Sequence, residues 1–361
     1  MFRSIAWTWV VVAVTMPVLT AAPFYADKTR LLVFVDEQGQ EKPVTTLQEW
    51  AIRRRHILEN FQEVAGPFPE ASRKVPLEPR ILEEIREPSY TRIKLALAVE
   101  KDDRLPVWLL IPHEARKRED GTQPKVPAVL VPHQTTRIGK DEPVGVGGKP
   151  DLHIAKHLAE RGYVALAPDY PNYGEYVIDV YQRGYVSGTM KGIWNHMRCV
   201  DYLQSLPEVD PNRIGAIGHS LGGHNSIFVA VFDERIRCIV SNCGFNSFPR
   251  YMGGNLAGWS HKGYMPRIRE RYEMKPAKMP FDFTELVAAL APRPFLACAP
   301  LRDGNFDVQG VRDCIAAATP VYILHQVPQN LAAHYPDCAH EFPAEVRETA
   351  YDWLDRHLKR K

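Results

Sequence analysis

Near the middle of the chain the sequence reads Ile214-Gly-Ala-Ile-Gly-His-Ser-Leu-Gly-Gly-His224, an apolar strand pattern followed by one serine among glycines. It contains the pattern G-x-S-x-G over Gly218 to Gly222. A serine on a tight turn between strand and helix is strained, so the residues two positions away on either side must lack bulk. Chance would give this pattern in about one such chain in twenty, so its position between a predicted strand and a predicted helix carries more weight. The sequence predicts that Ser220 is a nucleophile; the alternative is an ordinary Gly-rich turn.

A serine hydroxyl is a weak nucleophile unless a histidine takes its proton and a carboxylate orients that histidine. His340 lies in a loop just before the last predicted helix and is the first choice for the base, ahead of His334. Asp303 follows a buried predicted strand and is the first choice for the acid, with Asp307 as the second. The order serine, acid, histidine is the one expected for a nucleophile on such a turn.

Two backbone N–H groups are the candidates for stabilising an oxyanion. The N–H of Leu221 is at the N-terminus of the helix that follows the serine, where developing negative charge is favoured. The second donor is expected in the loop Pro132-His-Gln-Thr-Thr136, from Gln134 or its neighbour Thr135. A purely structural turn is the alternative for this loop.

Around the motif, strands alternate with helices. This rhythm predicts an α/β fold with a mostly parallel central sheet covered by helices on both faces. The predicted strands span residues 91–97, 105–111, 126–131, 163–167, 213–217, 236–240, 294–299 and 321–326, and the predicted helices 44–64, 151–161, 189–206, 221–232, 308–318 and 344–358. The rhythm lapses at residues 244–291, which we interpret as a cap-like insertion over the carboxyl edge of the sheet; an ordinary surface excursion is the alternative.

The chain divides into three predicted parts. Residues 1–22 have a basic start, an apolar run and small residues at the end, which indicates a secretory signal peptide rather than a membrane span. Residues 23–89 form an N-terminal extension, and residues 90–361 the main domain. We therefore expect a secreted or periplasmic protein with no stable membrane partner after cleavage of the leader; an uncleaved anchor is the alternative.

Composition narrows the function further. The net charge of +2 argues against a nucleic-acid partner. The basic run Arg53-Arg54-Arg55 is expected on a solvated helix face, and the six cysteines are expected to be buried free thiols. No metal or cofactor is expected, because residues 303–314 depart from a calcium-binding loop and no nucleotide-binding glycine motif follows a strand. Three tyrosines, Tyr170, Tyr173 and Tyr176, suit either sugar stacking or packing under a cap.

The phrases RIGAIGHSLGGHN, ALAPRPFLACAPLRDGNFD and DCAHEFP resemble the α/β-hydrolase superfamily from about Tyr90 onward. Within it the chain resembles secreted bacterial esterases related to acetyl xylan esterases and dienelactone hydrolases, although dienelactone hydrolases carry cysteine where Ser220 stands. Glucuronoyl esterases typically have arginine where this chain has Leu221, and many superfamily members have His-Gly where it has His133-Gln134. The phrase ALAPRP is also similar to catalytic domains of the prolyl oligopeptidase type.

The resemblance and the residues together predict a serine hydrolase that cleaves carboxylic esters, including acyl esters of carbohydrates, through Ser220, His340 and Asp303. Two alternatives remain open. One is a serine peptidase of the prolyl oligopeptidase type. The other is a binding module on the same fold without catalysis.

Overall fold

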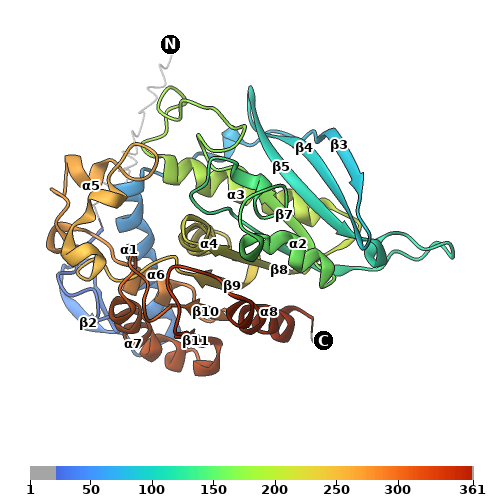
Figure 1. The fold of residues 1–361 in the computed structure, drawn as a ribbon. Helices are drawn as coiled ribbons and strands as arrows, with labels where there is room; N and C mark the ends of the chain where they lie inside the picture. Colours follow the sequence, from blue (N-terminus) through green and yellow to red (C-terminus); the bar gives the residue numbers. More distant parts are fainter. Residues whose placement is uncertain (1–21, 360–361) are drawn as a thin grey trace, which may run out of the picture.

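The computed structural model describes residues 22–359. Its centre is a nine-stranded sheet in the order β11-β10-β9-β8-β6-β7-β5-β4-β3 (Figure 1). Strands β6 to β11 pair in parallel, whereas β3, β4 and β5 form an antiparallel edge. The strands are β3 (Arg80–Arg86), β4 (Tyr90–Glu100), β5 (Asp103–Pro112), β6 (Val126–Leu130), β7 (Val164–Pro168), β8 (Val209–His219), β9 (Ile236–Asn242), β10 (Phe295–Cys298) and β11 (Leu331–His334).

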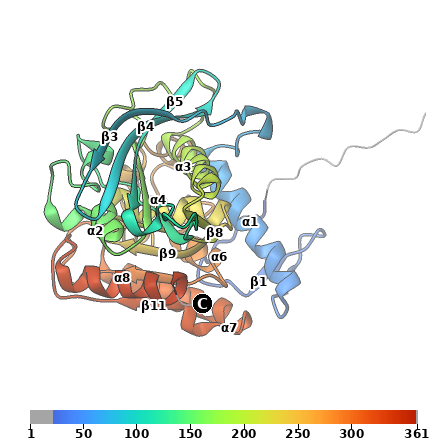
Figure 2. The ribbon, with the colours of Figure 1, turned by 90° about the vertical axis from the view of Figure 1, so that its right-hand side faces the viewer.

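Helices cover both faces of this sheet, which confirms the predicted α/β layering (Figure 2). On one face α3 and α4 contact the strands, and α1 and α6 pack against that layer; on the other face lie α2 and α8. Strands buried from both sides must be apolar on both sides, as the buried runs of β6, β7 and β10 are. The helices are α1 (Leu47–Ala65), α2 (Ile154–Glu160), α3 (Gly188–Ser205), α4 (Leu221–Phe232), α5 (Arg267–Glu270), α6 (Phe283–Ala289), α7 (Val308–Leu324) and α8 (Ala344–Leu358).

The prediction of a strand at residues 321–326 is wrong. Helix α7 continues through Pro320 to Leu324, and the edge strand β11 comes later. Proline in a helix interior and the β-branched residues Val321 and Ile323 both argue locally against a helix. Packing overrides this preference, because Val321 and Tyr322 are fully buried and the Tyr322 hydroxyl donates a hydrogen bond to the Arg293 carbonyl at 3.1 Å.

The N-terminal extension docks closely onto the main domain. It contains a small hairpin of β1 (Val33–Val35) and β2 (Glu41–Pro43), then α1, and its last strand, β3, belongs to the central sheet. Arg53 on α1 is fully buried and forms an ion pair with Glu285 of α6 at 2.5 Å, so the predicted solvated face is wrong for this residue. Arg55, by contrast, is exposed. The predicted signal peptide lies, apart from Ala22, outside the described residues.

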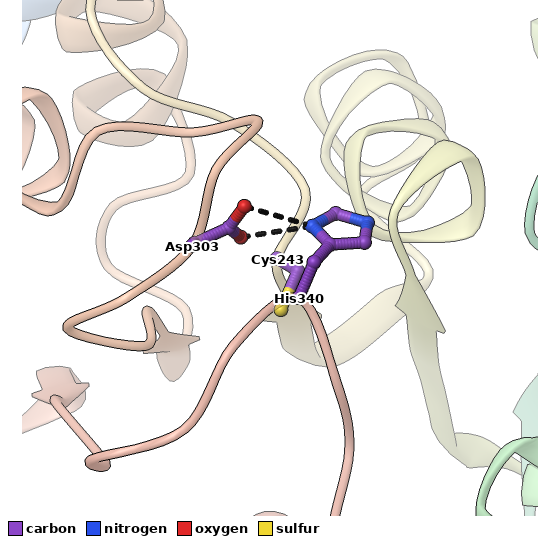
Figure 3. Close-up of side chains that lie close together, drawn as sticks. All are labelled: Cys243, Asp303 and His340. Atoms are coloured by element: carbon purple, nitrogen blue, oxygen red, sulfur yellow. Dashed lines mark hydrogen bonds and ion pairs between the residues drawn. The ribbon is translucent and has the colours of Figure 1, made fainter.

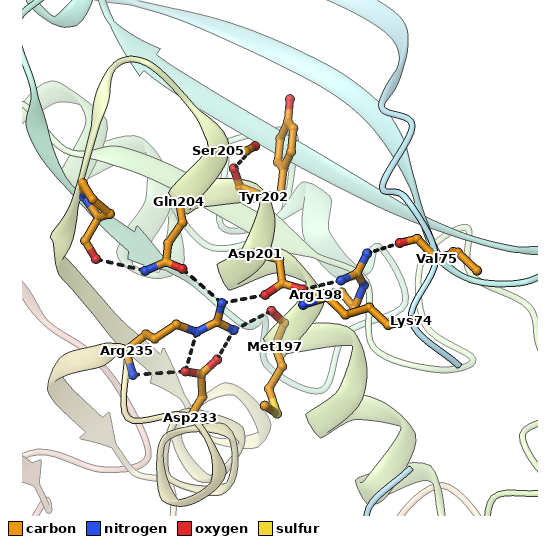
Figure 4. A network of polar contacts seen from close by, with 11 residues as sticks. Lys74, Val75, Met197, Arg198, Asp201, Tyr202, Gln204, Ser205, Asp233 and Arg235 are labelled. Atoms are coloured by element: carbon orange, nitrogen blue, oxygen red, sulfur yellow. Dashed lines mark hydrogen bonds and ion pairs between the residues drawn. The ribbon is translucent and has the colours of Figure 1, made fainter. Parts of the chain in front are cut away.

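A charged network fastens the segment before β3 to α3 (Figure 4). The Lys74 ammonium contacts the Asp201 carboxylate at 2.9 Å, and Arg198 donates to the Val75 carbonyl. Arg235 bridges Asp201 at 2.6 Å, and it also pairs with Asp233 at the end of α4. Three segments far apart in sequence are thus held together on one side of the sheet.

The outer edge of the sheet carries four charged side chains together with two exposed apolar ones, Ile81 and Leu82. Strand β3 reads Arg-Ile-Leu-Glu-Glu-Ile-Arg, and nearly all of its side chains are exposed. Within residues 22–359 no helix combines the length and apolar character that a bilayer crossing needs.

Candidate active site

Ser220 occupies a strained corner between β8 and α4. Its backbone has φ 54° and ψ −116°, a conformation that non-glycine residues rarely adopt and that costs about 1–3 kcal/mol. The Ser220 N–H donates to the Asn242 carbonyl of β9 at 2.9 Å, which anchors the corner to the sheet. Such strain is retained at functional sites only where the surrounding structure enforces it.

The glycines around the serine meet the steric requirement that the sequence indicated. A Cβ at Gly218 would lie 2.3 Å from the carbonyl carbon of Gly222, and one at Gly222 would lie 2.1 Å from the Pro132 carbonyl oxygen. Both distances fall well below any real contact, so backbone would have to move. Gly222 therefore lets the loop after β6 approach the start of α4.

Asp303 and His340 lie together (Figure 3). His340 lies in the loop after β11, and Asp303 lies in the loop after β10. The His340 Nδ1 is 2.9 Å from each carboxylate oxygen of Asp303. An ionised carboxylate only accepts hydrogen bonds, so the shared proton lies on Nδ1, and Nε2 of the neutral ring is left as an acceptor. The imidazole is 29% exposed, whereas the carboxylate is 1% exposed.

The surroundings of Asp303 keep it ionised. Burial alone would raise the pKa of its carboxyl group, but the hydrogen bond from His340 and the charge of His340 lower this pKa. The backbone N–H groups of Asn305 and Phe306 donate to the carboxylate at 2.8 and 3.1 Å, and the net effect lowers the pKa. A carboxylate that is ionised at neutral pH can stabilise a charged imidazole.

The rival candidates lie elsewhere. Asp307 is the N-cap of α7, and its carboxylate accepts from the Gln309 N–H at 2.7 Å rather than from His340. His334 is the last residue of β11, and His325 follows the end of α7 rather than lying on a strand. Among the described residues, His340 is the histidine that pairs with Asp303.

His219, the residue before Ser220, packs against the Asp303–His340 pair. The ring of His219, the residue before the serine, lies 4.7 Å from the ring of His340 between centroids. Within residues 22–359 the Ser220 hydroxyl makes no hydrogen bond to His340. The structure therefore brings the three elements to one edge of the sheet, with the Asp303–His340 contact formed.

Asn242 is a site residue that sequence reasoning missed. Its side-chain amide donates to the His219 Nδ1 at 2.7 Å and to the Glu341 carbonyl at 3.0 Å. Its own carbonyl accepts from the Ser220 N–H. The only signal in the sequence was a polar residue at the end of a buried strand, which does not reveal these partners.

The predicted oxyanion donors lie close to each other. Leu221 is the first residue of α4, and the Pro132 and His133 carbonyl oxygens come against Gly222, the next residue of that helix. In the described part of the chain, neither the Leu221 N–H nor the Gln134 N–H donates a hydrogen bond to another protein group. Both donors are thus available, and their role remains a prediction.

A buried histidine connects the loop after β6 to Tyr170. The Tyr170 N–H donates to the His133 Nε2 at 3.0 Å, so the ring proton lies on Nδ1 and donates to the Gln134 carbonyl at 2.5 Å. Burial lowers the pKa of His133 to about 4, which keeps the ring neutral. The Gln134 side chain is held separately, because it donates to the Glu142 carboxylate at 2.7 Å.

Buried and partly buried aromatic side chains pack against the start of α4. The ring of His224, one turn beyond Ser220, lies 4.8 Å from Trp259 and 5.5 Å from Tyr264 in the 244–291 insertion. Tyr170 and Tyr176 are buried and pack in the core, whereas Tyr173 is only partly buried. Of the three tyrosines, Tyr173 alone has a ring that a ligand can reach.

A third group adjoins the acid and the base. The thiol of Cys243, directly after β9, lies beside Asp303 and His340 in Figure 3. One ligand atom from each of these three residues lies within 4.8 Å of the other two. All six cysteines are buried and unpaired, as predicted.

Residues 151–361, more than half of the chain, match the prolyl oligopeptidase family. This chain belongs to the prolyl oligopeptidase family. This family member is 27% identical over 283 residues to YtaP of Bacillus subtilis (strain 168), which is named as a hydrolase; the match covers 73% of this chain and 87% of YtaP. It is also 26% identical over 134 residues to Carbohydrate esterase MZ0003 of an unknown prokaryotic organism, covering 34% of this chain and 30% of that one.

Solved structures share the whole architecture. A glucuronoyl esterase from Solibacter usitatus superposes with a TM-score of 0.72 and 20% identity, covering 93% of this chain and 99% of the other. At this identity the likeness establishes the fold. The prolyl oligopeptidase family member described here has the α/β-hydrolase fold, as the sequence resemblance predicted.

Proposed function

We propose that this protein is a secreted or periplasmic serine hydrolase that cleaves carboxylic esters, with acyl esters of carbohydrates as its substrates. The observation that carries the proposal is the Asp303–His340 contact beside the strained Ser220 corner. No metal ion or organic cofactor is needed, since these side chains and the backbone donors suffice for acyl transfer.

The first half-reaction forms an acyl-enzyme. The Ser220 Oγ attacks the ester carbonyl carbon while its proton passes to the His340 Nε2. The negative charge that develops on the carbonyl oxygen accepts hydrogen bonds from the N–H groups of Leu221 and Gln134. When the C–O bond breaks, the His340 proton goes to the leaving alcohol.

The second half-reaction repeats these roles with water. His340 takes a proton from water, whose oxygen attacks the acyl carbon. The tetrahedral intermediate then collapses, the carboxylic acid leaves, and the proton returns to the Ser220 Oγ. Asp303 remains ionised throughout and stabilises the imidazolium that forms twice in the cycle.

Carbohydrate esters are proposed as the substrate class on two grounds. Relatives that match parts of the chain or its fold are named as a carbohydrate esterase and a glucuronoyl esterase. The partly exposed ring of Tyr173 beside the oxyanion loop, 5.5 Å from His133 between ring centroids, offers a surface on which a sugar can stack.

The decisive experiment replaces the nucleophile. Ser220→Ala should lower kcat/KM for p-nitrophenyl acetate and for acetylated sugars by about 10³-fold or more, because the acyl-enzyme cannot form. Ser205→Ala, at the end of α3 away from the site, is the matched control and should retain parental activity. A Ser220→Ala enzyme within about tenfold of the parent would exclude Ser220 as the nucleophile.

Family membership favours one second candidate, a peptidase. Turnover of a proline-containing peptide amide, measured beside p-nitrophenyl acetate, separates the two activities. Labelling by a fluorophosphonate probe, which reacts with activated serines, tests for catalysis of either kind. A folded protein that takes up no label would instead be a binding module.

A further inference from the structure

The Cys243 thiol takes no part in the hydrolysis proposed above, yet it lies against the acid and the base. Cys243, Asp303 and His340 come from the ends of three adjacent parallel strands, β9, β10 and β11. Their ligand atoms, a sulfur, a carboxylate oxygen and an imidazole nitrogen, lie within 4.8 Å of one another (Figure 3).

The backbone holds the thiol in this place. Cys243 has φ 49°, in the left-handed region, and its N–H donates to the Cys298 carbonyl at 2.9 Å. The thiol also contacts the Glu341 carbonyl at 3.5 Å, next to His340 in sequence. The thiol is therefore fixed between the loop that carries the base and the loop that carries the acid.

The three groups of this cluster differ in exposure. The His340 side chain is 29% exposed, the Asp303 side chain 1% and Cys243 3%. A cavity of about 300 Å³ borders Asp303 and is also lined by Asp307, Arg250 and Leu301. An ion would therefore meet His340 first and would need side-chain movement to contact the thiol.

Sulfur, imidazole nitrogen and carboxylate oxygen are the donors that Zn²⁺ prefers, in a tetrahedral arrangement that three protein ligands leave open at one position. A thiolate ligand also favours Zn²⁺ and softer ions over Mg²⁺ and Ca²⁺. Bond lengths of about 2.0–2.3 Å to a shared ion require ligand atoms closer than 4.8 Å. Small rotations of the Cys243 and His340 side chains would therefore be needed to bring all three ligand atoms within bonding distance of one ion.

We propose that Cys243, Asp303 and His340 form an inhibitory site for a thiophilic divalent cation such as Zn²⁺. The cation takes the lone pair of the His340 Nδ1 and one carboxylate oxygen of Asp303. The Cys243 thiol loses its proton to solvent and binds as thiolate. The remaining ring proton then lies on the His340 Nε2, which can no longer accept the proton of Ser220, so hydrolysis stops.

This inference rests on the proposed function only where inhibition is the readout, so binding is measured separately. Metal-free protein is titrated with ZnCl₂ by calorimetry, and with CdCl₂ while the ultraviolet thiolate-to-cadmium absorption is followed. The variants are Cys243→Ala and Cys243→Ser, the second being closer in shape should the first fold poorly. Cys199→Ala, which removes a buried thiol on α3, is the matched control.

We expect one ion per chain, a cadmium–thiolate absorption in the parent and in Cys199→Ala, and its loss in both Cys243 variants. Zn²⁺ should inhibit the parent, and the inhibitory concentration should rise by about tenfold or more in the Cys243 variants, each compared with its own metal-free rate. Equal inhibition of parent and Cys243 variants, or no thiolate absorption in the parent, would overturn the proposal. Binding with no measurable hydrolysis would instead count against the proposed function alone.

Discussion

His219 packs beside His340, the proposed base, and has no chemical step of its own in the proposed mechanism. Its ring packs 4.7 Å from that of His340, and its Nδ1 accepts from the Asn242 amide. Burial, together with the nearby His340, lowers the pKa of His219 to about 3. A neutral ring therefore lies next to His340, and it would add no repulsive charge to the imidazolium of the proposed mechanism.

The identity of the acid is testable at the same scale. Asp303→Asn should lower kcat/KM for p-nitrophenyl acetate by about 10⁴-fold, because an amide can neither fix the productive tautomer of His340 nor offset its charge. Asp307→Asn, which changes only the N-cap of α7, should lose less than about tenfold, since asparagine caps a helix as well as aspartate does. A larger loss in the Asp307 variant would reverse the assignment.

The residues of this site differ in how far the sequence reveals them. The tight turn at Ser220 could be predicted because it is local and its glycines are required sterically. The contact between Asp303 and His340 could be predicted because loops after consecutive parallel strands meet at one edge of the sheet, while the catalytic roles of all three residues stay predictions. Asn242 and Cys243 could not, because their partners depend on the register of β9 beside β8 and β10 and on the path of the loop after β11.

At the scale of elements, α6 begins at an unusual carboxyl group. Asp282 is its N-cap and accepts from the N–H groups of Phe283 and Phe248, at 2.5 and 3.0 Å. Desolvation nevertheless raises the pKa of Asp282 to about 7, against an ordinary value of 3.8. The folded chain therefore retains a proton that the unfolded chain releases between about pH 4 and pH 7.

This proton makes α6 a source of pH-dependent stability. Because the folded state binds the proton more tightly, Asp282 should destabilise the fold progressively as pH rises from about 4 to about 7, and then by a constant amount. Asp282→Asn keeps a capping oxygen without the charge, so its free energy of unfolding relative to the parent should be higher at pH 8 than at pH 5. Urea denaturation at both values measures this difference.

Asp337→Asn, the same substitution at an exposed carboxylate in the loop after β11, is the matched control. An Asp282→Asn effect of equal size at pH 5 and pH 8 would contradict the raised pKa.

Element prediction failed where local preference and packing disagree. Helices α4 and α8 have the predicted bounds, since their apolar pattern, starts and ends agree. In α7, Pro320 and the β-branched residues after it favoured a break, whereas the burial of Val321 and the contact of Tyr322 with Arg293 favour the continuous helix. Such contacts join residues 29 positions apart and leave no local signal.

For the whole molecule, the docking of α1 is one of the contacts that join the extension to the main domain, beside the pairing of β3 with β4 and the contacts of Lys74 and Val75 with α3. The Arg53 guanidinium pairs with Glu285 and lies 3.4 Å from the centroid of the Tyr25 ring. Arg54 adds hydrogen bonds to the carbonyls of Ala289 and Val231 at 3.0 and 2.9 Å. Two of the three arginines in the run predicted to be solvated thus form contacts with the main domain, which the charge pattern alone could not show.

Breaking the buried pair should therefore destabilise the whole fold. Arg53→Met leaves Glu285 charged and unpaired in the interior, and should cost about 3–5 kcal/mol of unfolding free energy. Arg55→Met, two residues away and exposed, removes only a surface pair with Glu59 and should cost less than about 1 kcal/mol. Urea unfolding of both variants gives the comparison.

A double variant, Arg53→Met with Glu285→Gln, should recover part of the loss because no uncompensated charge remains. If Arg53→Met and Arg55→Met lowered the free energy of unfolding equally, the buried pair of the extension would contribute little to the cooperative unfolding of the domain.

The charged edge of β3 bears on how copies of this chain meet one another. An open strand offers unpaired backbone groups on which a second molecule can build a continuous sheet, the first step toward fibrils. The row Arg-Ile-Leu-Glu-Glu-Ile-Arg sets like charges against like when two such strands pair in parallel register, which keeps crowded molecules apart. The charges of β3, at the opposite edge of the sheet from the candidate site, thus disfavour aggregation through this strand.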